Sequence, residues 1–305
     1  MSLQSRPLFG YAANVPFGQG AAAEAVVQAA EAAGFDLFSI TDHPYGAQSF
    51  EPYAAVPYLL GRTSRISGYV GVTNLPLRPA PMLARTVASI ASLSGGRFAL
   101  GLGSGGYWEH ITRMGVPHLT PREAVDAFEE AIEVVHALTG GPGRSVDFEG
   151  EHYRVDHLAP SAVPTPPIWT GSGGPRALAI TGRLADGWIP PGGSDWTTQV
   201  YREGRARIDA AASKAGRDPG DVITVINLGT PILSGADLPA TRGADGRFVG
   251  GSAAQWVEEI TGAVAEHGIA GFNAAVLDEN GAINLETIAR FGAEVIAPVR
   301  EAVGG

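Results

Sequence analysis

The sequence has 305 residues, among them 42 Gly and no Cys, and its 21 basic and 31 acidic residues give a formal net charge of −10. The lack of Cys excludes disulfides, thiolate zinc sites, iron–sulfur clusters and a cysteine nucleophile. The acidic balance and the scattered Arg residues argue against a nucleic-acid-binding domain. No apolar run approaches the roughly 18 residues of a membrane span, and residues 1–7 lack the features of a signal peptide, so we expect a cytoplasmic protein without membrane contact.

Short β-branched or aromatic runs alternate with longer Ala-rich helical patterns along nearly the whole chain, which is typical of repeated βα units. The predicted strands are 9–13, 37–41, 66–72, 97–100, 168–170, 187–189, 222–228 and 272–277. The predicted helices are 21–33, 53–60, 81–93, 121–138, 175–184, 196–215, 252–267 and 285–296, with Pro298 just beyond the last. Eight βα pairs predict an α/β fold, a single (β/α)8 TIM barrel over residues 1–305. A doubly wound sheet stays open, because strand order cannot be read from one sequence.

Two segments depart from this rhythm. Residues 145–156 predict a β-hairpin decoration after the fourth helix, because apolar residues flank a Glu149–Gly150 pair. Residues 229–251 contain six Gly and two Pro and are too long for an ordinary βα loop. This insertion follows the seventh strand, on the face where barrels carry their active sites, so we interpret it as a mobile lid. A surface excursion is the alternative.

Thr41, Asp42 and His43 directly follow the second predicted strand. A His at this end of a barrel strand can donate or accept a proton near neutral pH, or hydrogen-bond a reacting oxygen. Asp42 is close enough in sequence to order the loop around it. We therefore take His43 and Asp42 as catalytic candidates, and a loop-capping Asp beside a packed His as the alternative.

Gly101, Gly103 and Gly106 form a G-x-G-x-x-G pattern directly after the fourth predicted strand. The next confident helix begins only near residue 121, which disfavours a Rossmann turn. We instead expect the bare backbone of Gly103, Ser104 and Gly105 to lie against a flat ring or its side chain. A tight barrel corner would use the same residues.

Another Gly-rich strand end, residues 171–175, opens the helix at 175–184. Backbone N–H groups of Gly173 and Gly174 and the Ser172 hydroxyl would form a phosphate cradle, to which Arg176 adds a permanent positive charge. A plain βα turn is the alternative. Residues 71–74, at the end of the third strand, predict only a barrel loop.

Two remaining patterns carry no chemistry. The seven His residues show no H-E-x-x-H pattern, so we expect no metal site. Acidic residues recur at helical spacing within 121–138, and they predict a solvated helix face; they are Asp126, Glu129, Glu130 and Glu133.

Taken together, the sequence resembles the bacterial-luciferase-like superfamily of flavin- and deazaflavin-dependent oxidoreductases. The resemblance rests on three stretches: AAGFDLFSITDH at 32–43, LPLRPAPMLARTVASIASLSGGRFALGLGSGG at 75–106, and IWTGSGGPRALAITGRLADGW at 168–188. Within the superfamily, SGGPRALAITGRLADG looks most like the branch that uses coenzyme F420. The resemblance implies a (β/α)8 barrel with an insertion after the seventh strand, and commonly a homodimer.

The resemblance also implies where a cofactor would bind. The family places its ring at the C-terminal barrel mouth, supported by a non-prolyl cis peptide that would fall at Gly71–Val72. Asp42 and His43 match the loop beside the ring. The family's linker contacts match Gly103, Ser104 and Gly105, and its phosphate site matches Ser172, Gly173 and Gly174. Arg176 and Arg183 would face the acidic tail of F420.

The resemblance implies an enzyme that transfers a hydride between F420 and a small organic substrate. His43 would handle the accompanying proton, while Tyr45, Tyr107 and Trp108 would shape the substrate pocket. Gly106 stands where the sugar-phosphate-oxidising branch has a catalytic Glu, which disfavours glucose-6-phosphate as the substrate. The alternatives are an FMN-dependent monooxygenase supplied by a partner flavin reductase, and a non-catalytic ligand-binding barrel.

Overall fold

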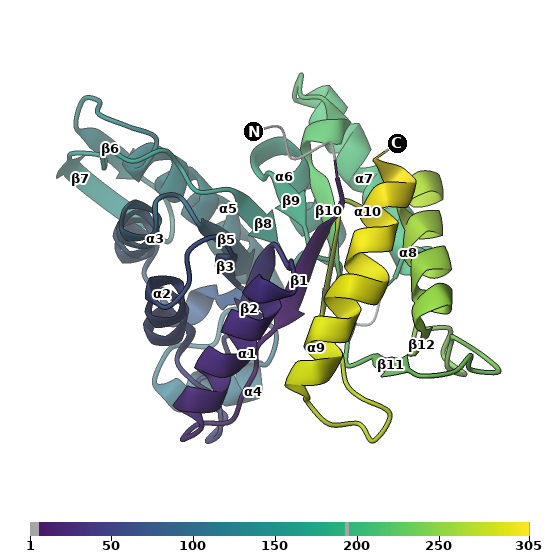
Figure 1. Ribbon diagram of the computed structural model, residues 1–305. Helices are drawn as coiled ribbons and strands as arrows, with labels where there is room; N and C mark the ends of the chain where they lie inside the picture. Colours follow the sequence, from purple (N-terminus) through teal and green to yellow (C-terminus); the bar gives the residue numbers. More distant parts are fainter. Residues whose placement is uncertain (1–5, 193–194, 305) are drawn as a thin grey trace.

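The structure is a computed structural model that describes residues 6–192 and 195–304 (Figure 1). Residues 1–5, which carry most of the expectation about a signal peptide, lie outside the described residues. Among the helices that are described, none combines the length and hydropathy needed to cross a bilayer.

Within the described residues, eight parallel strands form a closed ring. They are β1 (Leu8–Ala12), β2 (Leu37–Ile40), β3 (Ser67–Val70), β5 (Phe98–Gly103), β8 (Ile168–Thr170), β9 (Gly187–Trp188), β10 (Ile223–Gly229) and β13 (Gly271–Ala274). The register Leu8↔Gly271 joins the first strand to the last, and Gly68↔Phe98 joins β3 to β5. This closure confirms the predicted barrel and excludes the doubly wound sheet.

The helices surround this ring. They are α1 (Gly20–Ala32), α2 (Pro52–Gly61), α3 (Ala80–Ser94), α5 (Pro121–Leu138), α6 (Pro175–Leu184), α7 (Gln199–Lys214), α8 (Ala253–His267), α9 (Leu285–Phe291) and α10 (Ala297–Val303). The predicted end of the last helix before Pro298 is wrong. The helix continues through a π-helical turn over Gly292–Ile296 directly into α10, so Pro298 lies within the helical segment, just after the π turn.

Two apolar cores follow from the alternation of side chains along the strands. The larger one fills the space between the strands and the helices. The smaller one fills the barrel interior, with Leu8, Leu37, Tyr69, Ala99, Trp169, Ile189, Ile223 and Val225. The barrel interior is therefore packed with side chains, and a ligand site must lie at its mouth.

Figure 1 shows the β6–β7 hairpin and both termini toward one end of the barrel, and α4 (Trp108–Ile111), β11 (Ile232–Ser234) and β12 (Gly250–Ser252) toward the other. Because β1 starts close to the N-terminus and all barrel strands are parallel, the end with α4 is the C-terminal mouth. The predicted hairpin is present as β6 (Val146–Glu149) and β7 (Arg154–Leu158). It lies away from the mouth.

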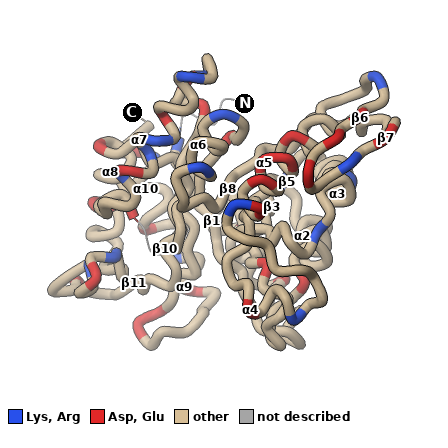
Figure 2. Tube along the Cα trace, turned by 180° about the vertical axis from the view of Figure 1, so that it is seen from behind, with Lys and Arg blue, Asp and Glu red and all other residues tan. Residues whose placement is uncertain are grey.

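The acidic residues of α5 bind neighbouring elements, and the expectation of a solvated face is wrong for three of them. Acidic positions recur along this helix (Figure 2). Glu130 accepts hydrogen bonds from the N–H groups of residues 151–153 in the hairpin. Asp126 and Glu129 form ion pairs with Arg176 and Arg183 of α6. These carboxylates therefore join α5 to α6 and to the hairpin.

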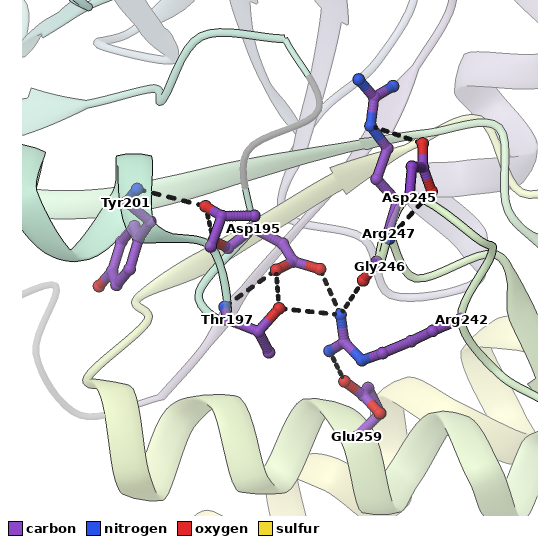
Figure 3. A network of polar contacts seen from close by, with 9 residues as sticks. Asp195, Thr197, Tyr201, Arg242, Asp245, Gly246, Arg247 and Glu259 are labelled. Atoms are coloured by element: carbon purple, nitrogen blue, oxygen red, sulfur yellow. Dashed lines mark hydrogen bonds and ion pairs between the residues drawn. The ribbon is translucent and has the colours of Figure 1, made fainter.

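One guanidinium of the insertion after β10 makes several bonds to the barrel wall. Arg242 donates hydrogen bonds to Asp195, Glu259 and the carbonyl of Gly246 (Figure 3). Its guanidinium also lies 5.4 Å from the ring centroid of Trp196. The pairing of β11 with β12 closes the insertion at its base. Arg242 thus ties the insertion to the segment before α7 and to α8. The role of residues 229–251 as a mobile lid stays a prediction.

Candidate active site

The loop after β2 is held by the buried carboxylate of Asp42. Its Oδ2 atom accepts hydrogen bonds from the backbone N–H of Asn74 at 2.9 Å and from Nε of Arg78 at 3.1 Å, and its Oδ1 accepts from Nη2 of Arg78 at 2.8 Å. Arg78 also pairs with Glu51, whose carboxylate caps the N-terminus of α2. These bonds occupy both oxygens of Asp42, so the geometry suits it to hold the loop rather than to react.

His43, the neighbouring candidate, lies half-buried among aromatic side chains. Its Nδ1 atom is 2.6 Å from the hydroxyl of Tyr45, and its ring meets Tyr107 edge-on at 5.4 Å between centroids. Tyr45 in turn stacks on His110 at 5.3 Å. The structure therefore brings together the side chains of His43, Tyr45 and Tyr107, and their role as a substrate pocket stays a prediction.

Burial governs the protonation of this pair. Desolvation lowers the pKa of His43 below 6.5, although the charge of Asp42 acts in the opposite direction. Desolvation also raises the pKa of Tyr45, with smaller contributions from Tyr107 and Asp42. At neutral pH the imidazole is therefore uncharged and the Tyr45 hydroxyl keeps its proton. A neutral imidazole has one donor and one acceptor nitrogen, and its acceptor nitrogen can take up a proton as a general base.

The third substrate-pocket candidate, Trp108, begins α4 and packs against the ring of His118 at 5.1 Å. A Cβ atom on Gly105 would lie 3.3 Å from its Cζ2 atom. Trp108 thus covers the end of the loop after β5, while Tyr107, at 62% exposure, faces solvent beside His43.

The peptide bond between Gly71 and Val72 is cis, as the resemblance implied. The Val72 side chain lies between two strand ends. A Cβ atom on Gly103 would come within 2.9 Å of Val72 Cγ2, and one on Gly171 within 2.8 Å of the same atom. A Cβ on Gly101 would be 1.9 Å from the carbonyl oxygen of Val70. These glycines make room for the residues at and just after the end of β3. The missing side chain of Gly103 therefore leaves space for Val72 and not for a ligand.

The next two residues of this strand end differ from Gly103. Ser104 is half-buried. Gly105 has a φ of +95°, and a Cβ there would meet Pro76 Cγ at 2.8 Å. Gly105 is therefore required by both its backbone conformation and its close neighbour.

The candidate phosphate cradle has an exposed half and a buried half. Gly173 and Gly174 are exposed, and Gly174 begins α6 without a side-chain cap. Ser172 is buried, and its hydroxyl accepts a hydrogen bond from Thr181 at 3.0 Å. The N–H groups at the start of α6 are therefore the part of the cradle that faces outward.

The two Arg candidates on α6 are not equivalent. Arg176 lies in the first turn, next to the cradle, with its guanidinium 2.6 Å from Asp126. Arg183 lies in the last turn, paired with Glu129. The length of α6 separates Arg183 from the cradle, so an anion at the N-terminus of α6 is out of its reach.

One residue of this site was missed. Asn74 is 7% exposed, and its Oδ1 atom has no hydrogen-bond partner. It ends β4 (Thr73–Asn74), which pairs in register with the end of β5. The available signal was an amide side chain at a strand end, two residues after the position where the resemblance places a cis peptide.

Potential metal ligands gather elsewhere in the part of the chain that the structure describes. Two groups of three come within reach of one another, and both include hairpin residues. They are Asp126, Glu151 and His152, and Asp147, Asp156 and His157. Asp126 of the first group also pairs with Arg176, and the absence of a metal from the mouth stays a prediction.

Comparison with known proteins places these features in a family. A family model described as luciferase-like monooxygenase matches residues 10–281. An F420-dependent glucose-6-phosphate dehydrogenase from Nakamurella multipartita is 31% identical over 235 residues, which are 72% of this chain and 66% of that protein. An F420-dependent hydroxymycolic acid dehydrogenase from Mycobacterium tuberculosis is 33% identical over 239 residues, 75% of this chain and 63% of that protein. The chain thus spans slightly less than two thirds of the length of these relatives.

Solved structures show the same fold. An F420-dependent secondary alcohol dehydrogenase in complex with an F420–acetone adduct matches with a TM-score of 0.79 at 19% identity, covering 96% of this chain and 99% of that one. The EDTA monooxygenase from Chelativorans sp. matches with a TM-score of 0.77 at 17% identity, covering 97% and 94%. At these identities the likeness concerns the barrel alone.

Proposed function

The chain belongs to the luciferase-like monooxygenase family, and we propose that it is an oxidoreductase that transfers a hydride between coenzyme F420 and a small organic substrate. The observation that carries the proposal is the neutral, half-buried His43 beside Tyr45 at the barrel mouth. The names of two relatives, both F420-dependent dehydrogenases, support the choice of cofactor.

The residues at the mouth fit a ring with a phosphate-bearing side chain. The unpartnered Oδ1 atom of Asn74 is a buried acceptor of the kind that a ring N–H satisfies. The uncapped start of α6 offers backbone N–H groups to a phosphate. We assign the phosphate to Gly173 and Gly174, and the ring to the side of Gly71 and Val72.

The remaining candidates receive narrower roles. Ser104 and Gly105 would contact the linker of the cofactor. Gly103 contributes only its main chain, because Val72 fills the space at its Cα. Ser172 would not contact the phosphate; its buried hydroxyl accepts a hydrogen bond from Thr181 and holds the loop in place. Asp42 acts as a positioning residue that holds the loop of His43 against Asn74 and Arg78.

When bound, F420 supplies a ring carbon that accepts or gives a hydride. The protein's own side chains would transfer the proton that accompanies the hydride. In alcohol oxidation, Nε2 of His43 would accept the hydroxyl proton while Nδ1 donates to the Tyr45 oxygen. In the reverse direction the imidazolium would return its Nε2 proton to the substrate oxygen, while Nδ1–H keeps its hydrogen bond to the Tyr45 oxygen. A Tyr hydroxyl serves either tautomer because it both donates and accepts.

Direct binding tests the proposal. The purified protein is titrated with oxidised F420 and, separately, with FMN, and the fluorescence of each is followed. We expect F420 to bind and FMN to bind more weakly. Tight FMN binding without F420 binding would replace F420 by the flavin.

An FMN-dependent monooxygenase is the second candidate, favoured by the description of the matching family model. It would need reduced flavin from a partner reductase. Binding of neither cofactor would leave the non-catalytic barrel. The homodimer implied by the resemblance is tested by the native mass from the same preparation.

A further inference from the structure

Arg and Lys side chains are scarce where the substrate would bind. Four segments follow the ends of β1, β2, β3 and β5 at the barrel mouth and together contain two Arg and no Lys; they are residues 13–19, 41–51, 71–79 and 104–120. Arg113 forms an ion pair with Glu109, four residues earlier. Arg78 pairs with both Asp42 and Glu51. Within these four described segments, no unpaired guanidinium or ammonium group is therefore offered to an anionic substrate.

The same segments expose aromatic side chains. Phe17 is 61% exposed and Tyr107 is 62% exposed, although both are large apolar residues. Phe17 packs against Phe50 at 5.2 Å between ring centroids, and its backbone N–H donates to the carbonyl of Gln48 at 2.6 Å. Both partners belong to the loop of His43. Exposed apolar groups that gather around a candidate site indicate an apolar ligand.

Tyr107 lies directly beside the ring that would hold the substrate oxygen. Nδ1 of His43 bonds the hydroxyl of Tyr45 at 2.6 Å, which leaves Nε2 for the substrate. The ring planes of His43 and Tyr107 are 84° apart, with 5.4 Å between their centroids. Because most of the Tyr107 side chain is exposed, this contact uses only part of its ring. The remaining ring surface can pack on a substrate.

The contacts at the mouth favour an aromatic substrate over an anionic one. Ring contacts already join the segment after β5 to the loop after β2, with Tyr107 on His43 and His110 on Tyr45. Aromatic rings attract one another in edge-on and offset arrangements, beyond the area that they bury. A substrate ring would extend this cluster. A phosphate or carboxylate would instead lose its hydration without gaining a cation, which costs free energy.

We propose that the substrate is an uncharged alcohol or carbonyl compound that carries an aromatic ring close to the reacting carbon, and that Tyr107 selects it by packing against that ring. This inference rests on the proposed function and names its substrate class. In the oxidation direction the carbinol C–H bond breaks and its hydride passes to oxidised F420. The hydroxyl proton passes to Nε2 of His43, and a C=O bond forms. Reduction with reduced F420 runs the same steps backwards.

Three matched ketones test the substrate class. They are phenylacetone, cyclohexylacetone, in which the ring is saturated, and (4-carboxyphenyl)acetone, which adds a negative charge. Each is offered with reduced F420, whose oxidation is followed by absorbance. We expect kcat/KM for phenylacetone to exceed that for cyclohexylacetone about threefold to tenfold, because an aromatic pair adds attraction beyond buried area. For the charged ketone kcat/KM should be about tenfold or more below that for phenylacetone, because its carboxylate meets no unpaired cation.

Substitution of Tyr107 tests the residue that sets the specificity. Tyr107→Leu should abolish the preference for the aromatic ketone, mainly by raising its KM, because the ring contact is made in the ground state and the transition state alike. Tyr107→Phe keeps the ring and should retain the preference. The matched control is Tyr58→Leu in α2, because Tyr58 is 56% exposed but bonds Glu24 of α1, away from these segments. This control should leave the ranking of the three ketones unchanged.

The outcomes separate this inference from the function on which it rests. A protein that binds F420 but reduces the charged ketone as fast as phenylacetone, or reduces none of the three, would overturn the substrate class and leave the proposed function standing. A preference that survives in Tyr107→Leu would remove Tyr107 from the specificity. A changed native mass of that variant with an unchanged ranking would assign the exposed ring to contact between copies of the chain. A protein that does not bind F420 would overturn both.

Discussion

The tetrapeptide Gly-Ser-Gly-Gly occurs twice at the barrel mouth, at 103–106 after β5 and at 171–174 after β8. The first glycine of each copy makes room for the same side chain, because Val72 lies between Gly103 and Gly171. The copies then diverge. Gly105 has a φ of +95° and is enclosed by Pro76 and Trp108, whereas its counterpart Gly173 has no positive φ and a Cβ there would meet only Pro191, at 3.3 Å. The last glycines of the two copies, Gly106 and Gly174, are both open.

The elements that follow explain the divergence. The first copy leads into Tyr107, which contacts His43, and then into the four-residue helix α4. The second leads directly into the ten-residue helix α6, whose uncapped N-terminus faces outward. Identical sequence thus supports the candidate acid–base group at one strand end and a candidate anion cradle at the other.

The largest expected effect separates packing glycines from open ones. Gly101→Ala places a Cβ on the carbonyl oxygen of Val70, and backbone cannot yield as a side chain can. We expect a loss of about 3 kcal/mol or more in the free energy of unfolding. Gly174→Ala should stay within about 0.5 kcal/mol, because its Cβ enters open space at an extended φ. Urea unfolding of both variants measures the contrast, and equal losses would refute the distinction.

Replacing His43 tests the chemistry assigned beside the first copy. His43→Ala should lower the rate of hydride transfer about 10²- to 10⁴-fold while F420 still binds, because general acid–base groups contribute that much. The control is His157→Ala, in the distant hairpin. Unchanged turnover in His43→Ala would remove His43 from the mechanism.

The pH profile of the wild-type enzyme sharpens this test. Oxidation needs an unprotonated imidazole, and burial lowers the pKa of His43 below 6.5. The rate should therefore hold as the pH falls through 6.5 and decline only below it. A decline centred above 6.5 would show that another group takes the proton.

A double substitution tests whether Val72 is the shared neighbour of the two copies. Gly103→Ala should cost about 1 to 3 kcal/mol, because its Cβ would lie 2.9 Å from Val72 Cγ2. Val72→Ala removes that methyl group, so the double variant should lose less than the sum of the single losses. Thermal unfolding of the four proteins gives the coupling energy, and strict additivity would mean that another group causes the clash.

The sequence predicted what depends on local pattern. Alternating apolar runs gave the strands and helices of the barrel, and the resemblance placed the cis bond at Gly71–Val72. Contacts between segments that are distant in the sequence could not be predicted. The strongest bonds of Asp42 are to Arg78, 36 residues later, and the partner of Arg176 is Asp126, 50 residues earlier. Such pairings decide whether a charged group is available, and no periodicity encodes them.

The glycines also show that contacts between segments cannot be predicted from the sequence. A bare backbone was read as an approach for a ligand, because a sequence does not show which side of a glycine is occupied. At Gly103 and Gly171 the occupant is Val72, a residue of the turn between β3 and β4. Asn74 was not predicted as a site residue because the sequence does not show that its side-chain oxygen is buried without a partner. That is known only from the burial of the side chain and the register of β4.

The smallest expected effect concerns Arg176, which stands beside the open cradle but is paired with Asp126. Arg176→Ala should weaken F420 binding by about twofold to fivefold at low salt, because one positive charge at an exposed helix N-terminus contributes little and is screened. Asp126→Asn releases the same guanidinium and should tighten binding if Arg176 turns to the phosphate. Equal affinities in both variants would assign anion binding to the main chain of Gly173 and Gly174 alone, and would leave Arg176 the structural task of joining α6 to α5.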